Sequence, residues 1–488
     1  MKYKLLILVL LGSFIQMQCD DLLEEDVFID VTSSNFFLSD ADAIAAVDAV
    51  YSKMRADGSV TDDSGERQGW GGFGYGIATV FNYQQLQTDE MVARFSVYNQ
   101  FTDFTLVPSN YGPFVSVFSD LFEGIFIANN VLSNIEGNDN ISEGIYKRVR
   151  GEALFGRALF YSTALSLFGN LPKITTPESD PFNQPEQVPP SEIVELVVAD
   201  LTEASDLLPA SYPQEDYGRF TKGAAYAYLA RFQLNQKNWS EAIEAARAVM
   251  GFGYSLSTDY GEIFSVNNEN NPEIILTLPS IAQLGIGNTM IAHTAEPDYV
   301  TGGWGGHLAR NEFYDSFDPD DYRRTFLIKE YQSVHETSES ISDGAMMIKY
   351  EPDPGRDGAW AGNDIVLHRL GELYLTLAEA LNEELGPNQE SIDLINALRD
   401  RAFDNDVSKR IQLIDFNTKE ALRDHILQER SWELYGENYR RDDLLRHGKY
   451  IQQALDRGVV NAQDFHVLYP IPQEEIDKNP NLVQNDGY

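Results

Sequence analysis

Aromatic side chains set between glycines are the residues of this 488-residue sequence with the clearest chemical use. A flat ring on a loop can bury the C–H face of a neutral sugar, while Asn, Gln, Asp or Arg side chains bind its hydroxyl groups. The alternative for each ring is that it packs its loop onto the rest of the protein. The predicted sugar-binding residues are Trp70, Phe73, Tyr75 and the neighbouring Arg67 in RQGWGGFGYG, Trp304 in GGWGGH, and Trp360 in GRDGAWAGND.

Motifs of known catalytic sites are missing from the sequence. The seven histidines show no H-E-x-x-H spacing, and there is neither a G-x-S-x-G elbow nor a Walker A loop. Residues 69–74 match G-x-G-x-x-G, but DDSGERQ, which is typical of a loop, stands where a dinucleotide site needs a strand. We therefore predict no enzymatic activity and no cofactor. A hydrolase with paired carboxylates stays open as an alternative, because 76 acidic residues make close pairs common by chance.

Acidic clusters such as DPDDYRR at 318–324 could offer oxygen ligands to calcium, but they lack the EF-hand pattern. We predict that Asp321 forms surface or interlobe ion pairs with Arg323 and Arg324. The formal net charge of −40 excludes a general nucleic-acid binder, since phosphate contacts need a basic face. The same charge favours neutral glycans over polyanionic ones, unless a local basic patch overrides it within the screening distance of about 8 Å.

The N-terminus predicts export and lipidation. Two lysines precede an apolar run of 11 residues, Leu5–Ile15, which suits a secretory signal and is too short to span a bilayer. Cys19, the only cysteine, follows this run, so no intrachain disulfide is possible. Its position resembles a bacterial lipoprotein cleavage site, and the acidic residues Asp20 and Asp21 resemble a surface-export signal. An ordinary signal peptide with an incidental cysteine is the alternative.

Helical periodicity dominates the chain beyond the acidic tether. Apolar stripes predict helices over 41–57, with Ser39 or Asp40 as cap, around 77–92 and 114–135, and from Pro190 to Leu208. A further stripe joins Leu154, Ala158, Tyr161, Leu165 and Phe168. Two helix pairs, in 222–250 and 370–398, have the spacing of a helical repeat, and NWSEAIEAARAVM resembles a tetratricopeptide helix.

Between these helix pairs the composition changes to Gly, Asn and Asp with short strands such as EIILTL, which predicts long, ordered loops. We predict a mainly α fold: a tetratricopeptide-like helical scaffold with an inserted, irregular, loop-rich ligand-binding lobe. The expected divisions are a signal peptide (1–18), a lipidated acidic tether (19–38), an N-terminal helical region (39–251) with an aromatic loop (58–76), the loop-rich lobe (252–363), and a C-terminal helical region (364–488).

Seven segments in their order along the chain are similar to the SusD/RagB family of Bacteroidota surface lipoproteins. His447 stands where this family often has Trp, and Tyr435–Gly436 replaces its more usual acidic-glycine pair; both departures fall on predicted scaffold. The segments are 150–172 (RGEALFGRALFYSTALSLFGNLP), 221–256, 302–324, 369–383, 395–402 (INALRDRA), 426–448 and 469–488.

The resemblance implies a glycan-binding lipoprotein without enzymatic activity, lipid-anchored in the outer membrane at Cys19 and exposed at the cell surface. It also implies that the protein delivers oligosaccharides to a SusC-like TonB-dependent barrel, over which it sits as a lid. In this family the N-terminal loop region around Trp70 commonly contributes to the ligand site. The same family contains RagB-type oligopeptide binders, and this cargo remains the alternative; the glycine-framed rings favour sugar.

Overall fold

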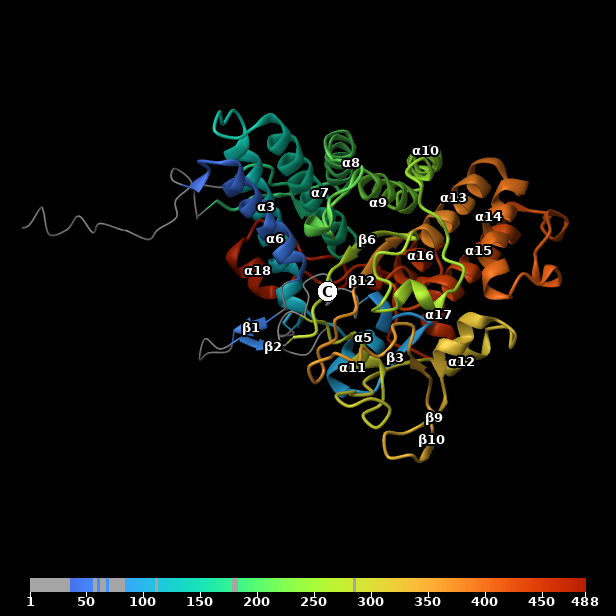
Figure 1. Ribbon diagram of the computed structural model, residues 1–488. Coiled ribbons are helices and arrows are strands. Elements are labelled where there is room, and N and C mark those ends of the chain that lie inside the picture. The colour runs from blue at the N-terminus through green and yellow to red at the C-terminus, as the bar shows by residue number, and fades with distance from the viewer. Residues whose placement is uncertain are drawn as a thin grey trace, which may run out of the picture.

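The computed structural model describes residues 36–55, 59–61, 67–69, 84–109, 113–177, 183–283 and 287–488. These residues form mainly helices, as the apolar stripes predict (Figure 1). The helices are α3 (Asp40–Arg55), α5 (Asn99–Thr102), α6 (Pro113–Ile135), α7 (Glu143–Phe168), α8 (Pro190–Leu207), α9 (Lys222–Asn235), α10 (Trp239–Met250), α11 (Met290–Thr294), α12 (Asn311–Asp315), α13 (Leu370–Leu385), α14 (Gln389–Ala402), α15 (Lys419–Leu434), α16 (Arg440–Arg446), α17 (Tyr450–Asp456) and α18 (Gln473–Lys478).

Consecutive long helices pack against each other along an arc. Helix α7 lies between α6 and α8, α9 packs on α8 and α10, and α13 joins α10 to α14 and α15. Figure 1 shows this arc running from α3 across the upper side of the molecule to α14 and α15. All five residues of the predicted α7 stripe are buried. Phe155 of α7 stacks on Phe220 at a centroid distance of 4.0 Å, which anchors the segment before α9 on α7.

Local capping signals set the ends of several helices. The Ser39 hydroxyl accepts a hydrogen bond from the Asp42 backbone NH (3.3 Å), and the Asp42 carboxylate accepts one from the Leu38 NH (3.1 Å), so the predicted cap of α3 is confirmed. Pro190 is the first residue of α8, where its missing NH costs nothing. The helix predicted around 77–92 is confirmed at residues 84–86, which are helical, but it does not reach 92, because the chain turns at Gln87 and is extended from Met91.

Short antiparallel pairs of strands supplement the helices within the described residues. The pairs are β1 (Ser59–Thr61) with β2 (Arg67–Gly69), β3 (Met91–Ala93) with β7 (His307–Ala309), β4 (Leu171–Pro172) with β5 (Gln187–Val188), β6 (Ile274–Leu278) with β12 (Ile365–Arg369), β8 (Leu327–Ile328) with β11 (Met346–Met347), and β9 (Glu330–Gln332) with β10 (Ser338–Ser340). Strand β6 lies in the predicted segment EIILTL. The β1–β2 ladder, in contrast, lies within 58–76, where the sequence predicted only a loop.

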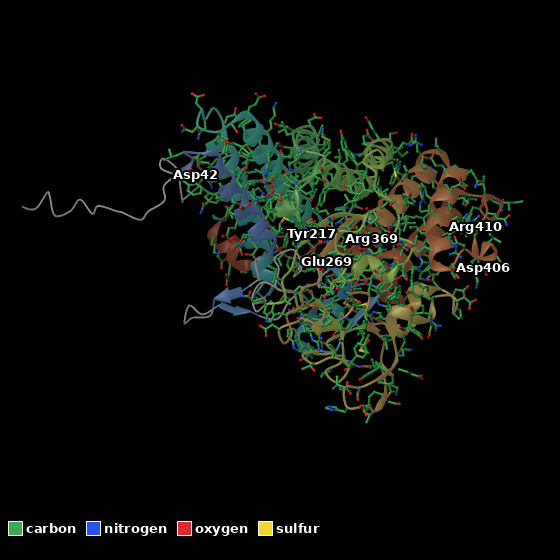
Figure 2. The ribbon with its side chains drawn as sticks, in the orientation of Figure 1. Asp42, Tyr217, Glu269, Arg369, Asp406 and Arg410 are labelled. Atoms are coloured by element: carbon green, nitrogen blue, oxygen red, sulfur yellow. The ribbon has the colours of Figure 1, made fainter. Side chains whose placement is uncertain are left out.

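A buried network of ion pairs joins the segment before β8 to the C-terminal helices. Glu433 of α15 bonds Arg369 (2.6 Å) and Arg323 (3.0 Å), and Arg323 also bonds Asp321 (2.7 Å). Figure 2 shows Arg369 near the centre of the molecule. The predicted pairing of Asp321 with Arg323 is confirmed, but both side chains are buried rather than at the surface. Arg324 does not pair with Asp321 and instead lies over the ring of Tyr314 at 4.3 Å.

Burial alone would raise the pKa of Glu433, but the positive charges of Arg401, Arg369 and Arg323 lower it below its usual value. Glu433 is therefore ionised, and breaking such a buried network by removing one charge costs about 3–5 kcal/mol. The lobe that contains Arg323 is thus firmly attached to α15. In the part of the chain that the structure describes, no helix has the length and apolar character needed to cross a membrane.

Candidate functional site

Trp304 lies on a tight loop between α11 and β7. Its backbone NH donates to the Ala292 carbonyl (2.6 Å), and its ring meets the ring of His293 edge-on at 4.8 Å. A Cβ on Gly303 would lie 2.5 Å from the Glu296 carbonyl, and one on Gly306 would lie 2.3 Å from the Phe95 ring. The glycines around Trp304 are therefore required by close packing, and the ring itself remains partly exposed.

Trp360 closes a tight turn in the segment before β12. Its NH donates to the Asp357 carbonyl, and the Asp357 NH donates back to the Trp360 carbonyl, both at 2.9 Å. Gly358, with φ of +59°, supplies the left-handed residue of this turn. The Asp353 carboxylate accepts hydrogen bonds from the NH groups of Gly355 and Gly362, both at 2.7 Å, and so holds the two ends of the loop together. The Trp360 side chain is partly exposed.

The loops that carry these two tryptophans are in direct contact. Gly302 has φ of +88°, and a Cβ there would lie only 2.4 Å from the Gly358 carbonyl oxygen. The Arg356 Nε donates to the Thr301 carbonyl at 2.9 Å. The structure thus brings two of the predicted rings onto adjoining loops, although 55 residues separate Thr301 from Arg356 in the sequence.

Arg94 fixes the Trp304 loop from the side of β3. Its guanidinium bonds Glu296 (2.5 Å), Asp343 (2.6 Å) and the Gly305 carbonyl (3.3 Å). The hydrogen bond to Asp343, with the one to Glu296, raises the pKa of Arg94 against the opposing effect of burial. The sequence did not single out Arg94, because its partners lie more than 200 residues away.

Two stacked histidines form the support beneath Trp304. The rings of His293 and His307 are 4.8 Å apart and 9° from parallel, and Tyr98 meets His307 at 5.0 Å. Both histidines are buried, and burial together with the neighbouring His293 lowers the pKa of His307 well below its usual value. The His307 ring is therefore uncharged near neutral pH. The GGWGGH spelling contained His307, but nothing in it indicated the partner from α11.

The other predicted site residues cannot be compared with the structure. Trp70, Phe73, Tyr75 and Cys19 lie outside the described residues. Arg67 begins β2, opposite Thr61 in the β1–β2 ladder, and only its backbone is described. Figure 1 shows this hairpin projecting at the left side of the molecule.

Glu269, a carboxyl group with a raised pKa, and the neighbouring Asp364 both have structural hydrogen-bond partners. Glu269 accepts a hydrogen bond from the Asp364 NH (2.8 Å), and Asp364 accepts from Ser280 NH and Tyr217 OH, both at 2.8 Å. Burial, followed by the charge of Asp364, raises the pKa of Glu269 to about 7. Tyr217 and Glu269 lie close together in Figure 2. These contacts pin the loop before β6 to the segment before α9, which is a structural role.

The arrangement around Trp304 and Trp360 suits recognition of a ligand face. It supplies partly exposed rings on rigid loops with charged and amide groups beside them, and rigid loops reduce the entropy lost on binding. Within the described ranges no group of three or more His, Cys, Asp or Glu side chains could hold a metal ion.

Two family models match the sequence. The model described as "SusD family" matches residues 343–488, and the model described as "Starch-binding associating with outer membrane" matches residues 77–234. The second match ends within α9, and the first begins just before β11 and runs to the last residue. Both models describe SusD-like proteins, and the two matched ranges lie on either side of the segment that contains Trp304.

Individual proteins give the same picture over the whole length. "SusD-like protein P25" of Formosa agariphila is 26% identical and covers 100% of this chain and 99% of its own. "Starch-binding protein SusD" of Bacteroides thetaiotaomicron is 28% identical, with 88% of both chains covered. Among solved structures, a "Laminarin binding SusD-like protein" is 26% identical with a TM-score of 0.78, covering 93% of this chain and all of that one. A SusD homologue of B. thetaiotaomicron, 20% identical, shares the fold with a TM-score of 0.79.

Proposed function

This chain belongs to the SusD family, and we propose that it binds oligosaccharides at the cell surface and passes them to a transporter. The observation that carries the proposal is the contact between the Trp304 and Trp360 loops, which places two partly exposed tryptophans on adjoining loops. A relative at 28% identity is named for starch binding, and a structural neighbour at 26% identity for laminarin binding. Both glycans are uncharged, in keeping with the −40 charge of this chain.

We also propose a lipid anchor at Cys19 and a SusC-like TonB-dependent barrel as partner. Association with the outer membrane is part of the family description, and the apolar run before Cys19 fits a lipoprotein signal. Two or more acyl chains hold a protein stably on a membrane. Residues 252–363 would form the lobe that faces the ligand, with Trp70, Phe73, Tyr75 and Arg67 contributing from the N-terminal loop.

Binding in this proposal involves no covalent step. Rings and polar groups hold the glycan with a Kd in the micromolar to millimolar range, which corresponds to a binding free energy of about −8 to −4 kcal/mol. Weak binding is sufficient because tethering beside the barrel raises the effective concentration of the captured ligand.

Affinity gel electrophoresis with starch, laminarin and a panel of neutral and anionic polysaccharides tests the proposal. We expect retardation by at least one neutral glycan and its loss in Trp304→Ala and Trp360→Ala. Trp239→Ala is the matched control, since Trp239 begins α10 on the helical scaffold. Retardation unchanged in both loop variants would refute this site, and binding of oligopeptides alone would replace glycan by peptide as the cargo. New reducing ends during incubation would show a hydrolase instead.

A further inference from the structure

A second cavity lies in the helical scaffold, apart from the tryptophan loops. It has a volume of about 520 Å³, within the range of small-molecule sites. Its walls come from α7, α9 and α16, with β6 and β12 at one end. In Figure 1, α7 and α9 occupy the upper side of the molecule, whereas α11 lies in the lower part. We call this space the scaffold cavity.

Arg231 of α9 lines the scaffold cavity without a hydrogen-bonded carboxylate, and the charges of Asp442 and Glu372 act on it only at longer range. Its guanidinium lies over the rings of Tyr439 (4.6 Å) and Tyr228 (5.6 Å) and makes no hydrogen bond or ion pair with any described residue. The neighbouring Arg446, in contrast, pairs with Glu379 at 2.6 Å. Stacking on two rings fixes the plane of Arg231 but leaves the donor edge of its guanidinium unused, and this fork matches a carboxylate.

Three buried polar atoms in the lining, on His368 and Gln84, have no hydrogen-bond partner among the described residues. Neither ring nitrogen of His368 has a partner within hydrogen-bond distance; its Nδ1 is 3.7 Å from Glu372. The Gln84 Oε1 has no partner either. His368 is 1% exposed and Gln84 is 3% exposed, so the bulk solvent does not satisfy them. Buried polar atoms are rarely left unpaired, which points to a bound molecule with polar atoms of its own.

The remaining lining restricts the chemistry of that molecule. Leu159, Phe232 and Leu445 give the walls apolar surface. The Asp442 carboxylate, which accepts a hydrogen bond from Ser166 Oγ at 2.8 Å, also lines the cavity, so a dianion such as a phosphate ester meets more repulsion than a monoanion. The charged lining residues are Arg231, Lys237 and Arg446 against Glu437 and Asp442, a net charge of +1, which matches one negative charge on the ligand.

We propose that the scaffold cavity binds a small carboxylic acid with an apolar body, its carboxylate on Arg231 and its polar contacts completed by His368 and Gln84. This site is independent of the glycan surface and does not rest on that function. The cavity lining contains neither Trp304 nor Trp360, so this ligand leaves both loops free.

Calorimetric titration of the full chain with 4-phenylbutyrate, and with the isosteric neutral 4-phenylbutyramide, tests this inference. Charge-assisted hydrogen bonds predict about tenfold weaker binding of the amide. Arg231→Gln should weaken the acid by a similar factor and leave the amide nearly unchanged. Lys222→Gln is the matched control: it removes one positive charge from the same helix, outside the cavity lining, and should change the Kd by less than about twofold.

In the unaltered protein, equal affinity for 4-phenylbutyrate and its amide would overturn the proposal. A failure of 4-phenylbutyrate to bind at all would also overturn it. Undiminished acid binding in Arg231→Gln would do the same. If Arg231→Gln fails to fold, Arg231→Lys keeps the charge and removes the fork, and we expect the acid to lose part of its advantage over the amide. Retardation of the protein in glycan-containing gels should be unaffected by 4-phenylbutyrate. This result would separate the scaffold cavity from the proposed glycan surface.

Discussion

Gly302→Ala should disrupt the joint between the two tryptophan loops. A methyl group there would lie 2.4 Å from the Gly358 carbonyl oxygen, and the residue has φ of +88°. The left-handed backbone costs about 1–2 kcal/mol for a residue with a Cβ, and forcing backbone apart in a packed region costs about 1–3 kcal/mol more. We expect the free energy of unfolding to fall by about 2–5 kcal/mol in total.

Gly358→Ala is the matched control for this prediction, because it sits across the same joint. Its φ is +59°, but a Cβ there would meet no atom within 4 Å, so only the backbone cost of about 1 kcal/mol remains. Urea unfolding of both variants, with affinity gels on the best neutral glycan, measures the difference. If the two variants lose stability within about 0.5 kcal/mol of each other, the inferred contact does not hold the loops together.

Three further predictions concern the scaffold and its ion pairs. Glu433→Gln leaves Arg369 and Arg323 without a shared carboxylate, and we expect the free energy of unfolding in urea to fall by about 3–5 kcal/mol; a loss below about 1 kcal/mol would contradict the role of the network. Phe155→Ala removes the ring stacked on Phe220, and we expect the free energy of unfolding in urea to fall by about 3–5 kcal/mol. A loss as small as that of an exposed residue would mean that the surrounding core closes around the gap. Glu269 has its pKa raised to about 7, so its contribution to stability is present below its unfolded pKa near 4.5 and is lost as pH rises through 7. Glu269→Gln should therefore raise the free energy of unfolding at pH 8 by roughly 1 kcal/mol after solvent screening, and urea unfolding at pH 4 should show no such gain.

The helical part of the fold could be predicted from the sequence because its signals are local. The α7 stripe, the Ser39 cap and the leading proline of α8 each act within one or two turns, and the structure confirms them. The expected helix around 77–92 was too long at its C-terminal end, because apolar periodicity alone does not reveal that Met91 begins a strand. That strand pairs with β7, whose residues lie more than 200 positions away, so its partner leaves no local trace.

The site was predictable in its residue types but not in its arrangement. The glycines on either side of Trp304 and Trp360 indicated that both lie on loops. In the structure these glycines allow close backbone packing and do not serve only to expose the rings. The histidine pair beneath Trp304 and the Arg94 clamp come from other parts of the chain, and no spacing rule could connect them. Arg323 was expected in surface or interlobe ion pairs; it is buried, and three carboxylates, from Asp321, Glu429 and Glu433, compensate its burial.

The tryptophan loops owe their order to side-chain clamps and close backbone contacts in addition to the histidine pair beneath Trp304. Asp353 ties the ends of one loop, Arg94 clamps the other, and Gly302 lets the two touch. A weak ligand gains most from such order, because every side chain that is already fixed spares about 0.5–1.5 kcal/mol on binding. Variants that loosen the loops should therefore weaken glycan binding although both tryptophan rings are still present. Comparing them with the tryptophan variants separates the effect of positioning a ring from the effect of its contact with the glycan.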